Sequence, residues 1–275
     1  MNDNPIYLVP YDFTPVADNA VNAAFDIAEH NDGIVYLLHI AERQSESVAA
    51  KNKIKEVVKN VSIIRKQRIR TKVLVGDLYD DIGKVGALLD ASLIVMGTHG
   101  AVGIQKIFGS KAVKMISKSS TPFLIVQSEQ SFSHVDTIVM PFSFDQESIQ
   151  ILNYLERLAK DFRSTIHLVG YHESDAWLKG KVKANQLIAR RALIDAGVRH
   201  EIVNLPKKAA FEKELLDYSM KVNADIIATT FYKKTVLPPP NTFIQEIIEN
   251  QPHIPVITIN ADETSLRSNL SFMSV

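Results

Sequence analysis

The sequence contains no cysteine among its 275 residues. This absence excludes disulfide bonds, metal sites built on thiolates and cysteine nucleophiles. Lysine and arginine number 31 and aspartate and glutamate also number 31, so the formal net charge is zero. The chain therefore lacks the excess positive charge that favours nucleic acid or an anionic membrane, and we expect neither as a partner.

Long apolar runs are also missing. No apolar segment approaches the roughly 20 residues that a membrane-spanning helix needs. The first four residues, Met-Asn-Asp-Asn, lack the basic start and apolar core of a signal peptide. These absences predict a cytoplasmic protein. The basic cluster at residues 65–68 is short, and we interpret it as solvated surface.

The most prominent feature that is present is an internal repeat. An apolar run ends in Pro10, and a similar run ends in Pro141, at an offset of 131 residues. The match continues without a gap to residues 28 and 159, and residues 91–126 match residues 224–259 at an offset of 133. A repeat this long indicates a duplicated domain rather than a solenoid. We predict two homologous domains, residues 1–130 and 131–275.

Each half alternates short apolar runs with segments of helical spacing. This alternation predicts an α/β fold in which each half is a doubly wound parallel sheet. In the first half we expect strands at 6–9, 34–40, 73–75, 93–96 and 123–126, and helices at 16–29, 47–64, 78–89 and from 110. The second half repeats the order, and the tail from 261 to 275 has little periodicity.

A glycine-rich loop follows the apolar run at residues 93–96. Gly97, Gly100 and Gly109 lie in it, and Ser110 opens the expected helix. Glycines let a backbone approach a phosphate closely, and a helix N-terminus favours an anion. The loop is neither a Walker A motif nor a dinucleotide-binding GxGxxG motif. A phosphate-binding loop and a plain tight turn both fit this segment taken alone.

Taken together, four segments resemble the universal stress protein family in its tandem two-domain form. They are residues 9–14, 37–40, 96–110 and 121–126, and the likeness extends to about residue 260. The resemblance implies a Rossmann-like fold of the adenine-nucleotide alpha-hydrolase type. Because the closing strands pair across a two-fold dimer in this family, it also implies an internal pseudo-dimer through residues 123–126 and 256–259. A homodimer of the whole chain is a further arrangement that the family allows.

Nucleotide-binding members of the family carry a G-x2-G-x9-G-(S/T) loop, whereas here only eight residues separate Gly100 from Gly109. The resemblance implies a site in the first half for ATP, or for AMP or ADP, with Mg²⁺ bound by Asp12. By this resemblance, Pro10, Tyr11 and Asp12 would lie beside adenine and ribose. Ile40 would form an apolar wall of the site, and Met96 would lie beneath the nucleotide. The ribose and phosphates would be surrounded by the residues of the glycine-rich loop and the helix start, which are Gly97, His99, Gly100, Gly109, Ser110 and Lys111.

Several of these residues also have a purely structural interpretation. Asp12 could cap the helix expected near residue 16, and Ser110 could cap the next one. His99 is interpreted as an exposed loop residue rather than a general base. His39 and His167 occupy matching positions within strands, which favours core histidines satisfied by hydrogen bonds.

The second half has lost the residues of this motif. Ser143 replaces Asp12, and proline fills residues 238–240, where it offers no backbone N–H. The remaining replacements are Thr230 for Gly97, Lys233 for Gly100, Thr242 for Gly109 and Phe243 for Ser110. We therefore expect at most one nucleotide per chain.

The sequence offers no Walker lysine, no metal-ligand cluster and no set of nucleophile, base and orienting group. The leading hypothesis is a stress-response binding or signalling module, not an enzyme. The alternatives are a nucleotide-free scaffold, which the shortened loop keeps open, and a slow ATPase. Adenylyl transfer is disfavoured because residues 10–14 do not form the glycine- and serine-rich loop of the related pyrophosphatases.

Overall fold

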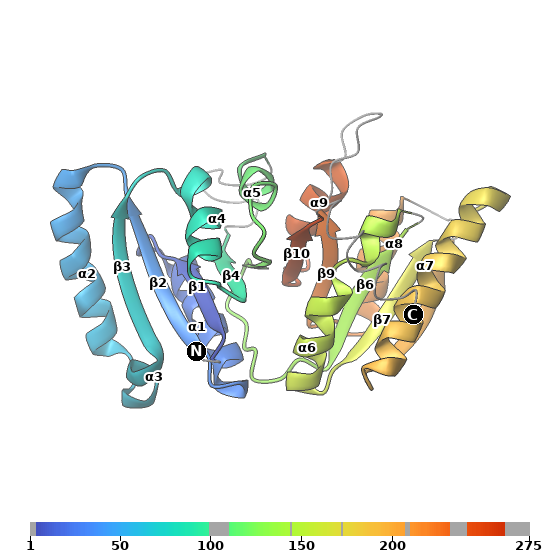
Figure 1. Cartoon of the computed structure of the whole chain (residues 1–275), viewed down its shortest axis with the longest axis horizontal. Coiled ribbons are helices and arrows are strands. Elements are labelled where there is room, and N and C mark those ends of the chain that lie inside the picture. Colours follow the sequence, from blue (N-terminus) through green and yellow to red (C-terminus); the bar gives the residue numbers. More distant parts are fainter. Residues whose placement is uncertain are drawn as a thin grey trace. The chain divides into compact units, whose positions relative to one another are not determined.

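The computed structural model describes residues 4–98, 110–143, 145–171, 173–206, 210–231 and 241–261. The chain divides into two compact units, Met1–Ser133 and His134–Val275. The side chains of residues 110, 111, 241 and 242 lie outside the description, although their backbone is helical. Each unit is a parallel sheet with helices packed against it (Figure 1).

The first unit alternates strands and helices along the chain. Its strands are β1 (Ile6–Pro10), β2 (Ile34–Ala41), β3 (Ile69–Val75), β4 (Leu93–Gly97) and β5 (Phe123–Val126). Its helices are α1 (Pro15–His30), the 3-10 turn η1 (Gln44–Glu46), α2 (Ser47–Asn60), α3 (Ile63–Arg68), α4 (Leu78–Leu88) and α5 (Ser110–Ile116).

The sheet of the first unit has the order β3-β2-β1-β4-β5. All of its pairs are parallel. The chain runs outward from β1 to β3 and then returns across the sheet to β4 and β5. With right-handed crossovers, this path puts α1 and α2 on one face and α4 and α5 on the other. The doubly wound α/β fold predicted from the sequence is confirmed.

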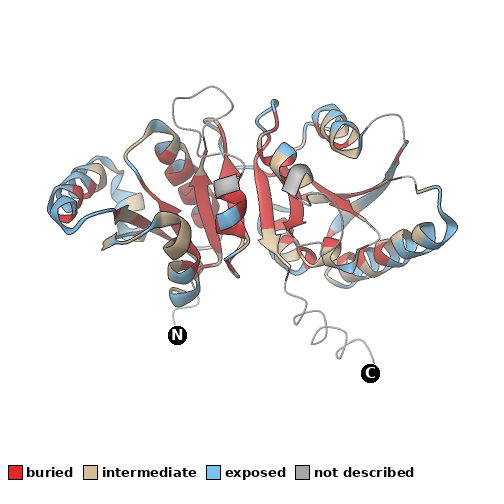
Figure 2. Ribbon diagram, turned by 90° about the horizontal axis from the view of Figure 1, so that it is seen from above, coloured by how far each residue is buried: buried red, intermediate tan, exposed pale blue. Residues whose placement is uncertain are grey.

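Strands β1, β4 and β5 are buried on both faces, which explains why they read as continuous apolar runs (Figure 2), whereas the outer strand β3 is largely exposed. Leu8 and Val9 in β1 and Ile94 and Val95 in β4 are fully buried. Much of the buried face of helix α1 is alanine, since Ala17, Ala20, Ala23, Ala24 and Ala28 are all buried. Small side chains let the helix approach the sheet closely.

The helix expected over residues 47–64 is interrupted in the structure. Helix α2 ends at Asn60, and Ser62 begins the separate helix α3. The Ser62 hydroxyl accepts a hydrogen bond from the backbone N–H of Arg65, which makes Ser62 the N-cap of α3. A serine that caps its own helix competes with continuation of the preceding one. The sequence pattern missed this because apolar spacing continues through the break.

The second unit repeats the first. Its strands are β6 (Thr137–Phe142), β7 (Thr165–Tyr171), β8 (Arg199–Leu205), β9 (Ile226–Phe231) and β10 (Val256–Asn260), in the order β10-β9-β6-β7-β8. Its helices are the 3-10 turn η2 (Gln146–Ile149), α6 (Leu152–Phe162), α7 (Ala176–Asp195), α8 (Phe211–Lys221) and α9 (Asn241–Ile248).

Strand register supports the duplication. Ile6 pairs with Ile34 in the first unit, and Thr137 pairs with Thr165 in the second, so both strands shift by the same 131 residues. The units differ after their first strands, because the second has a 3-10 turn where the first has the opening turns of α1. No helix in the described parts of the chain combines the length and apolar character needed to cross a membrane.

Candidate functional site

The sequence-predicted site lies at the carboxyl ends of β1 and β4. These strands are neighbours, since Tyr7 pairs with Leu93 and Leu8 with Ile94. The chain leaves β1 toward β2 on one side and leaves β4 toward β5 on the other. In open parallel sheets, such a reversal of direction opens a crevice in which ligands bind. The structure therefore brings the segment after Pro10 and the segment after Met96 to one switch point.

Tyr11 is anchored by its backbone and its side chain. Its N–H donates to the carbonyl oxygen of Leu38 (2.9 Å), and its hydroxyl donates to Asp18 in α1 (2.6 Å). The ring is buried. Burial first, and then the hydrogen bond to Asp18, raises the pKa of the Tyr11 phenol well above its ordinary range. Tyr11 therefore stays protonated and ties β1 to the first turn of α1.

Asp12 lies exposed at the end of β1. Its Oδ1 atom accepts hydrogen bonds from the backbone N–H (3.1 Å) and the hydroxyl (2.5 Å) of Thr14. Thr14, not Asp12, is the N-cap of α1, because the Thr14 side chain accepts from the N–H of Ala17. The alternative that Asp12 caps this helix is therefore wrong. The Oδ2 atom of Asp12 has no hydrogen-bond or ion-pair partner in the described part of the chain.

Phe13 and His39 complete this strand end, and Phe13 is not among the site residues predicted from the sequence. Phe13 has a positive φ of 66°, which is uncommon for a bulky residue and costs about 1 kcal/mol. Its ring centroid lies 5.2 Å from that of Tyr11 and 4.8 Å from that of His39. His39 donates from Nδ1 to the carbonyl oxygen of Tyr11 (2.8 Å). The histidine thus fixes the turn that presents Asp12.

A positively charged lysine side chain also lies at this end of the sheet. The ammonium nitrogen of Lys53, on α2, lies 5.3 Å from the centroid of the Phe13 ring. This is within the range of a cation–π contact. Lys53 brings positive charge beside the segment that carries Asp12, and no sequence motif pointed to it. Only the packing of α2 against the strand ends could have identified it.

The remaining described site residues line the strand ends. Ile40 is half-buried at the end of β2, and Met96 is buried in β4. Gly97 packs against α1, where an added β carbon would lie 2.1 Å from the carbonyl oxygen of Val16. The absence of a side chain at Gly97 therefore has a structural cause that does not involve a ligand.

Three predicted residues, His99, Gly100 and Gly109, lie outside the described residues. Ser110 and Lys111 form the first turn of α5, and only their backbone is described. The structure thus places six of the predicted residues together at the carboxyl-terminal ends of the strands: Pro10, Tyr11, Asp12, Ile40, Met96 and Gly97. The predicted contacts of the other five residues stay predictions.

At the carboxyl-terminal ends of the matching strands in the second unit, different side chains are present. Thr230 pairs with Ile259 as Gly97 pairs with Val126, and its hydroxyl oxygen lies 3.5 Å from the carbonyl oxygen of Ser148. The ring of Phe243, the counterpart of Ser110, stacks on Phe211 with centroids 5.9 Å apart and 9° between the planes. Threonine and phenylalanine side chains thus stand where the first unit has Gly97 and Ser110.

No cluster of three or more histidine, aspartate or glutamate side chains suited to a metal ion occurs among the described residues. Asp12 is therefore not part of a complete metal cage in this part of the protein. A cation held there would need ligands from elsewhere, such as water or phosphate oxygens, as Mg²⁺ commonly has.

Comparison with known proteins gives the family. A model described as the universal stress protein family matches residues 6–127. Residues 6–127, the first unit, therefore form a universal stress protein domain. The match spans the first unit from β1 through β5, including every predicted site residue.

Named relatives agree with this assignment. A universal stress protein of Methanocaldococcus jannaschii is 29% identical over 136 residues, which cover 44% of this chain and 80% of that protein. Universal stress protein G of Salmonella typhimurium is 26% identical over 129 residues, which cover 41% of this chain and 89% of that protein.

Solved structures extend the likeness in fold to both units. A universal stress protein from Archaeoglobus fulgidus matches 94% of this chain and 99% of its own, with a TM-score of 0.74 and 18% identity. A putative universal stress protein from Pseudomonas aeruginosa matches 98% of each chain, with a TM-score of 0.63 and 15% identity. The second unit therefore shares the universal stress protein fold, and the tandem form predicted from the sequence fits the whole chain.

Proposed function

We propose that the first unit binds ATP together with Mg²⁺ and that the chain acts as a stress-response binding or signalling module in the cytoplasm. The observation that carries the proposal is Asp12. Its carboxylate is exposed at the switch point of the sheet, and only one of its oxygens is used by Thr14. The other oxygen remains able to bind a cation.

The electrostatics around this carboxylate suit a metal-bound nucleotide. Asp12 would hold Mg²⁺, whose other ligands would come from phosphate oxygens and water. Lys53 adds positive charge nearby on α2, which favours the triphosphate. The glycine loop between Gly97 and Ser110 would supply backbone N–H groups to the phosphates.

The geometry favours binding over fast chemistry. His39 is engaged with the Tyr11 carbonyl, and Tyr11 is held in its protonated form. Tyr11 is therefore not available as a general base at neutral pH, and His39 is hydrogen-bonded to a carbonyl rather than to an orienting carboxylate. Bound nucleotide would act by changing the conformation or associations of the chain. We further propose that the two units pair through β5 and β10 as an internal pseudo-dimer.

A nucleotide-free scaffold is the second candidate. The observation that favours it is the loop between Gly100 and Gly109, which is one residue shorter than in nucleotide-binding members of the family. A scaffold would fold normally and bind no adenine nucleotide. Titration of the protein with ATP, described next, separates the two candidate functions.

The test is calorimetric titration of the full chain with ATP, with Mg²⁺ and again with a chelator. Asp12→Asn keeps an oxygen that can accept from Thr14 but removes the charge. We expect this variant to weaken ATP binding by about tenfold or more with Mg²⁺ present. The matched control is Asp217→Asn, an exposed carboxylate on α8 in the second unit that pairs with Lys213.

The titration with the chelator shows whether Asp12 affects ATP binding through Mg²⁺. If Asp12 acts through Mg²⁺, the wild type and Asp12→Asn should bind ATP with similar affinity once the metal is removed. Equal affinity of the two proteins in the presence of Mg²⁺ would remove Asp12 from the site. Folded wild-type protein that binds no adenine nucleotide would leave the scaffold as the function.

A further inference from the structure

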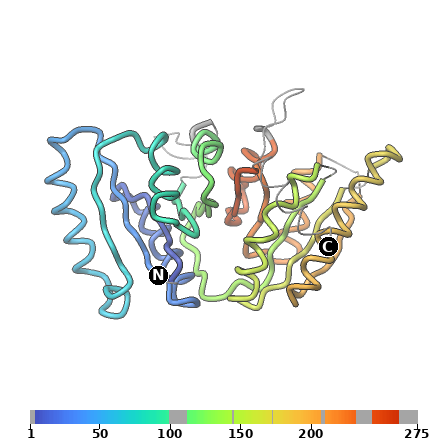
Figure 3. Tube along the Cα trace, in the orientation of Figure 1, coloured from blue at the N-terminus to red at the C-terminus, as the bar shows by residue number. Residues whose placement is uncertain are grey.

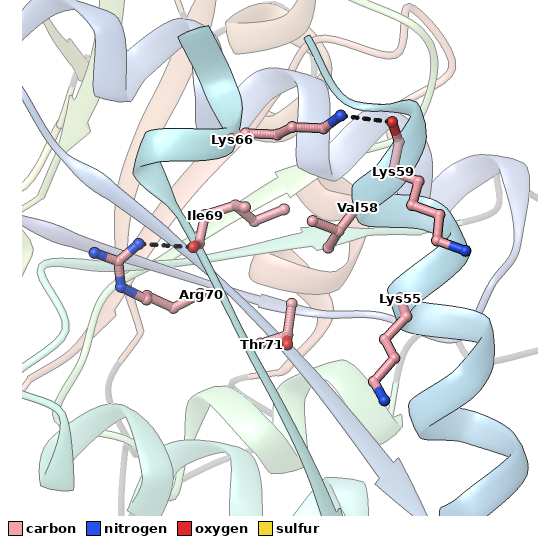
Figure 4. Close-up of a pocket in the computed structure, with 7 residues that line it drawn as sticks. All are labelled: Lys55, Val58, Lys59, Lys66, Ile69, Arg70 and Thr71. Carbon is pink, nitrogen blue, oxygen red and sulfur yellow. Dashed lines mark hydrogen bonds between the residues drawn. The ribbon is translucent and has the colours of Figure 1, made fainter. Parts of the chain in front are cut away.

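A hollow of 510 Å³ lies between α2, α3 and the beginning of β3 in the first unit. In Figure 3 the chain passes from α2 through the short α3 and then runs back along β3. Seven residues line the hollow, which we call the edge pocket: Lys55, Val58, Lys59, Lys66, Ile69, Arg70 and Thr71 (Figure 4). Because it lies at the start of β3, it is separate from the site at the carboxyl ends of β1 and β4.

The lining of the edge pocket is strongly basic. Four of its seven residues are lysine or arginine and none is acidic, although the whole chain has no net charge. Lys59 is neutralised by Glu56, with 2.6 Å between nitrogen and oxygen. Lys55, Lys66 and Arg70 make no ion pair with a carboxylate in the part of the chain that the structure describes. The pocket therefore keeps an excess of positive charge.

The other cations of the 65–68 cluster behave differently. Arg65 pairs with Asp26 (2.8 Å) and Glu29 (2.9 Å), and Arg68 pairs with Asp32 (2.7 Å). These carboxylates lie on or just after α1, so both arginines hold α3 to the body of the unit. The expectation that the whole 65–68 cluster is solvated surface is therefore wrong for its two arginines, which are engaged in ion pairs.

Lys66 and Arg70 are oriented by backbone oxygens instead. The ammonium group of Lys66 donates to the carbonyl oxygen of Lys59 (2.7 Å). The guanidinium group of Arg70 donates to the carbonyl oxygens of Ile69 (2.8 Å) and Gln67 (3.1 Å). Carbonyl oxygens restrain these groups without cancelling their charge, and both retain further N–H donors. The ammonium group of Lys66 is thus partly fixed at the pocket before any ligand arrives.

The floor of the edge pocket is apolar. Figure 4 shows the side chains of Val58 and Ile69 directed toward one another between the long basic side chains. Ile69 is buried and Val58 half-buried, while Thr71 contributes a hydroxyl group. Low-dielectric walls strengthen the field of nearby charges and concentrate counter-ions in a cleft.

The second unit provides an internal comparison. Arg70 pairs with Tyr36 on β2, and the residue at the matching register on β8 is Glu201, which pairs with His167 on β7. By the same register, Ile202 replaces Thr71. The charge at the Arg70 position is therefore reversed in the second unit.

We propose that the edge pocket binds a compact anion that carries two or more phosphoryl groups. A single exposed ion pair changes an affinity only about two- to fivefold, so one phosphate would bind weakly. A ligand with several charges can engage Lys55 and Lys66 together, whereas the Arg70 side chain points to the other side of β3 (Figure 4). The volume is within the range of small-molecule pockets, about 300–1,000 Å³. This proposal stands whether or not the first unit binds ATP.

The test is calorimetric titration of the full chain with inorganic tripolyphosphate at low salt. We expect Lys55→Glu combined with Lys66→Glu to weaken binding by about tenfold or more. The control combines Lys179→Glu with Lys221→Glu, which makes the same change in net charge at exposed positions of the second unit. We expect this control to bind within about twofold of the wild type. Lys55→Gln with Lys66→Gln replaces the first variant if thermal unfolding shows that it is not folded.

Three outcomes would overturn the proposal. They are a wild type that does not bind tripolyphosphate, a pocket variant that binds as tightly as the wild type, and equal weakening in the pocket and control variants, which would indicate a general charge effect. The binding of single-stranded RNA and of anionic vesicles is measured in parallel with the same proteins. Pocket-dependent binding of either of these, without binding of tripolyphosphate, would replace the small anion with a macromolecular partner.

Discussion

Gly97 at the end of β4 lies against the first turn of α1, so closely that a β carbon would come within 2.1 Å of the carbonyl oxygen of Val16. This contact joins two segments that both contribute to the candidate site. The first glycine of the loop is needed for packing between strand and helix, whatever the rest of the loop binds. In the second unit, the turn η2 replaces the start of the helix, and Thr230 is accommodated near Ser148.

Gly97→Ala should destabilise the protein by about 1–3 kcal/mol, because the backbone oxygen of Val16 cannot move aside as a flexible side chain could. The control is Gly180→Ala in α7, where an added β carbon meets no atom within 4 Å. That change should stabilise the protein by about 0.5–1 kcal/mol, because alanine favours a helix. Urea unfolding measures both. A neutral effect of Gly97→Ala would contradict the packing described here.

Tyr11→Phe should cost about 0.5–1.5 kcal/mol at neutral pH through loss of the hydrogen bond to Asp18. It should also change the pH dependence of stability. The pKa of the Tyr11 phenol is raised in the folded protein, mainly by burial. The unfolded chain therefore loses this proton first, so this contribution is complete below about pH 10 and is lost as the pH rises above it.

Urea unfolding of the wild type and Tyr11→Phe at about pH 8 and above about pH 10 provides the measurement. The advantage of the wild type should shrink at the higher pH. An advantage that grows with pH would have the wrong sign and would contradict the buried, protonated state of Tyr11.

ATP hydrolysis should be far slower than the ordinary enzyme median of about 10 per second. The physical reason is that the described residues of the site hold no set of nucleophile, base and orienting carboxylate, since Tyr11 stays protonated and His39 is bound to a carbonyl oxygen rather than to a carboxylate. Release of phosphate under saturating ATP and Mg²⁺ measures the rate. Turnover at the ordinary rate, abolished by Asp12→Asn without loss of binding, would make the protein an ATPase.

The predicted pairing of β5 with β10 can be tested by cross-linking, because the natural chain has no cysteine. Cysteine pairs placed along these two strands should form a disulfide within one chain upon mild oxidation. A pair at Lys72 and Val203, on β3 and β8 at the other ends of the two sheets, is the control. Cross-links only between different chains, or none at all, would refute the internal pseudo-dimer.

The order of strands and helices could be predicted because buried parallel strands leave an unmistakable apolar pattern, as in Leu93–Gly97. The break at Ser62 could not, because a cap depends on one hydrogen bond rather than on periodicity. Asp12 was predicted from its motif and lies exposed at the switch point, while its contact with a ligand stays a prediction. Phe13 and Lys53 were missed because their relation is a contact between α2 and a turn far away in the sequence.

The number of nucleotides bound per chain tests the central claim most directly. Calorimetric titration with ATP and Mg²⁺ should give at most one site, in the first unit. Gly109→Val should weaken binding greatly, because losing one charge-assisted phosphate contact costs about 1.5–3 kcal/mol, or roughly ten- to a hundredfold in affinity. Thr242→Val, at the counterpart position in the second unit, should leave binding unchanged. Two sites per chain, or binding indifferent to Gly109→Val, would contradict the account.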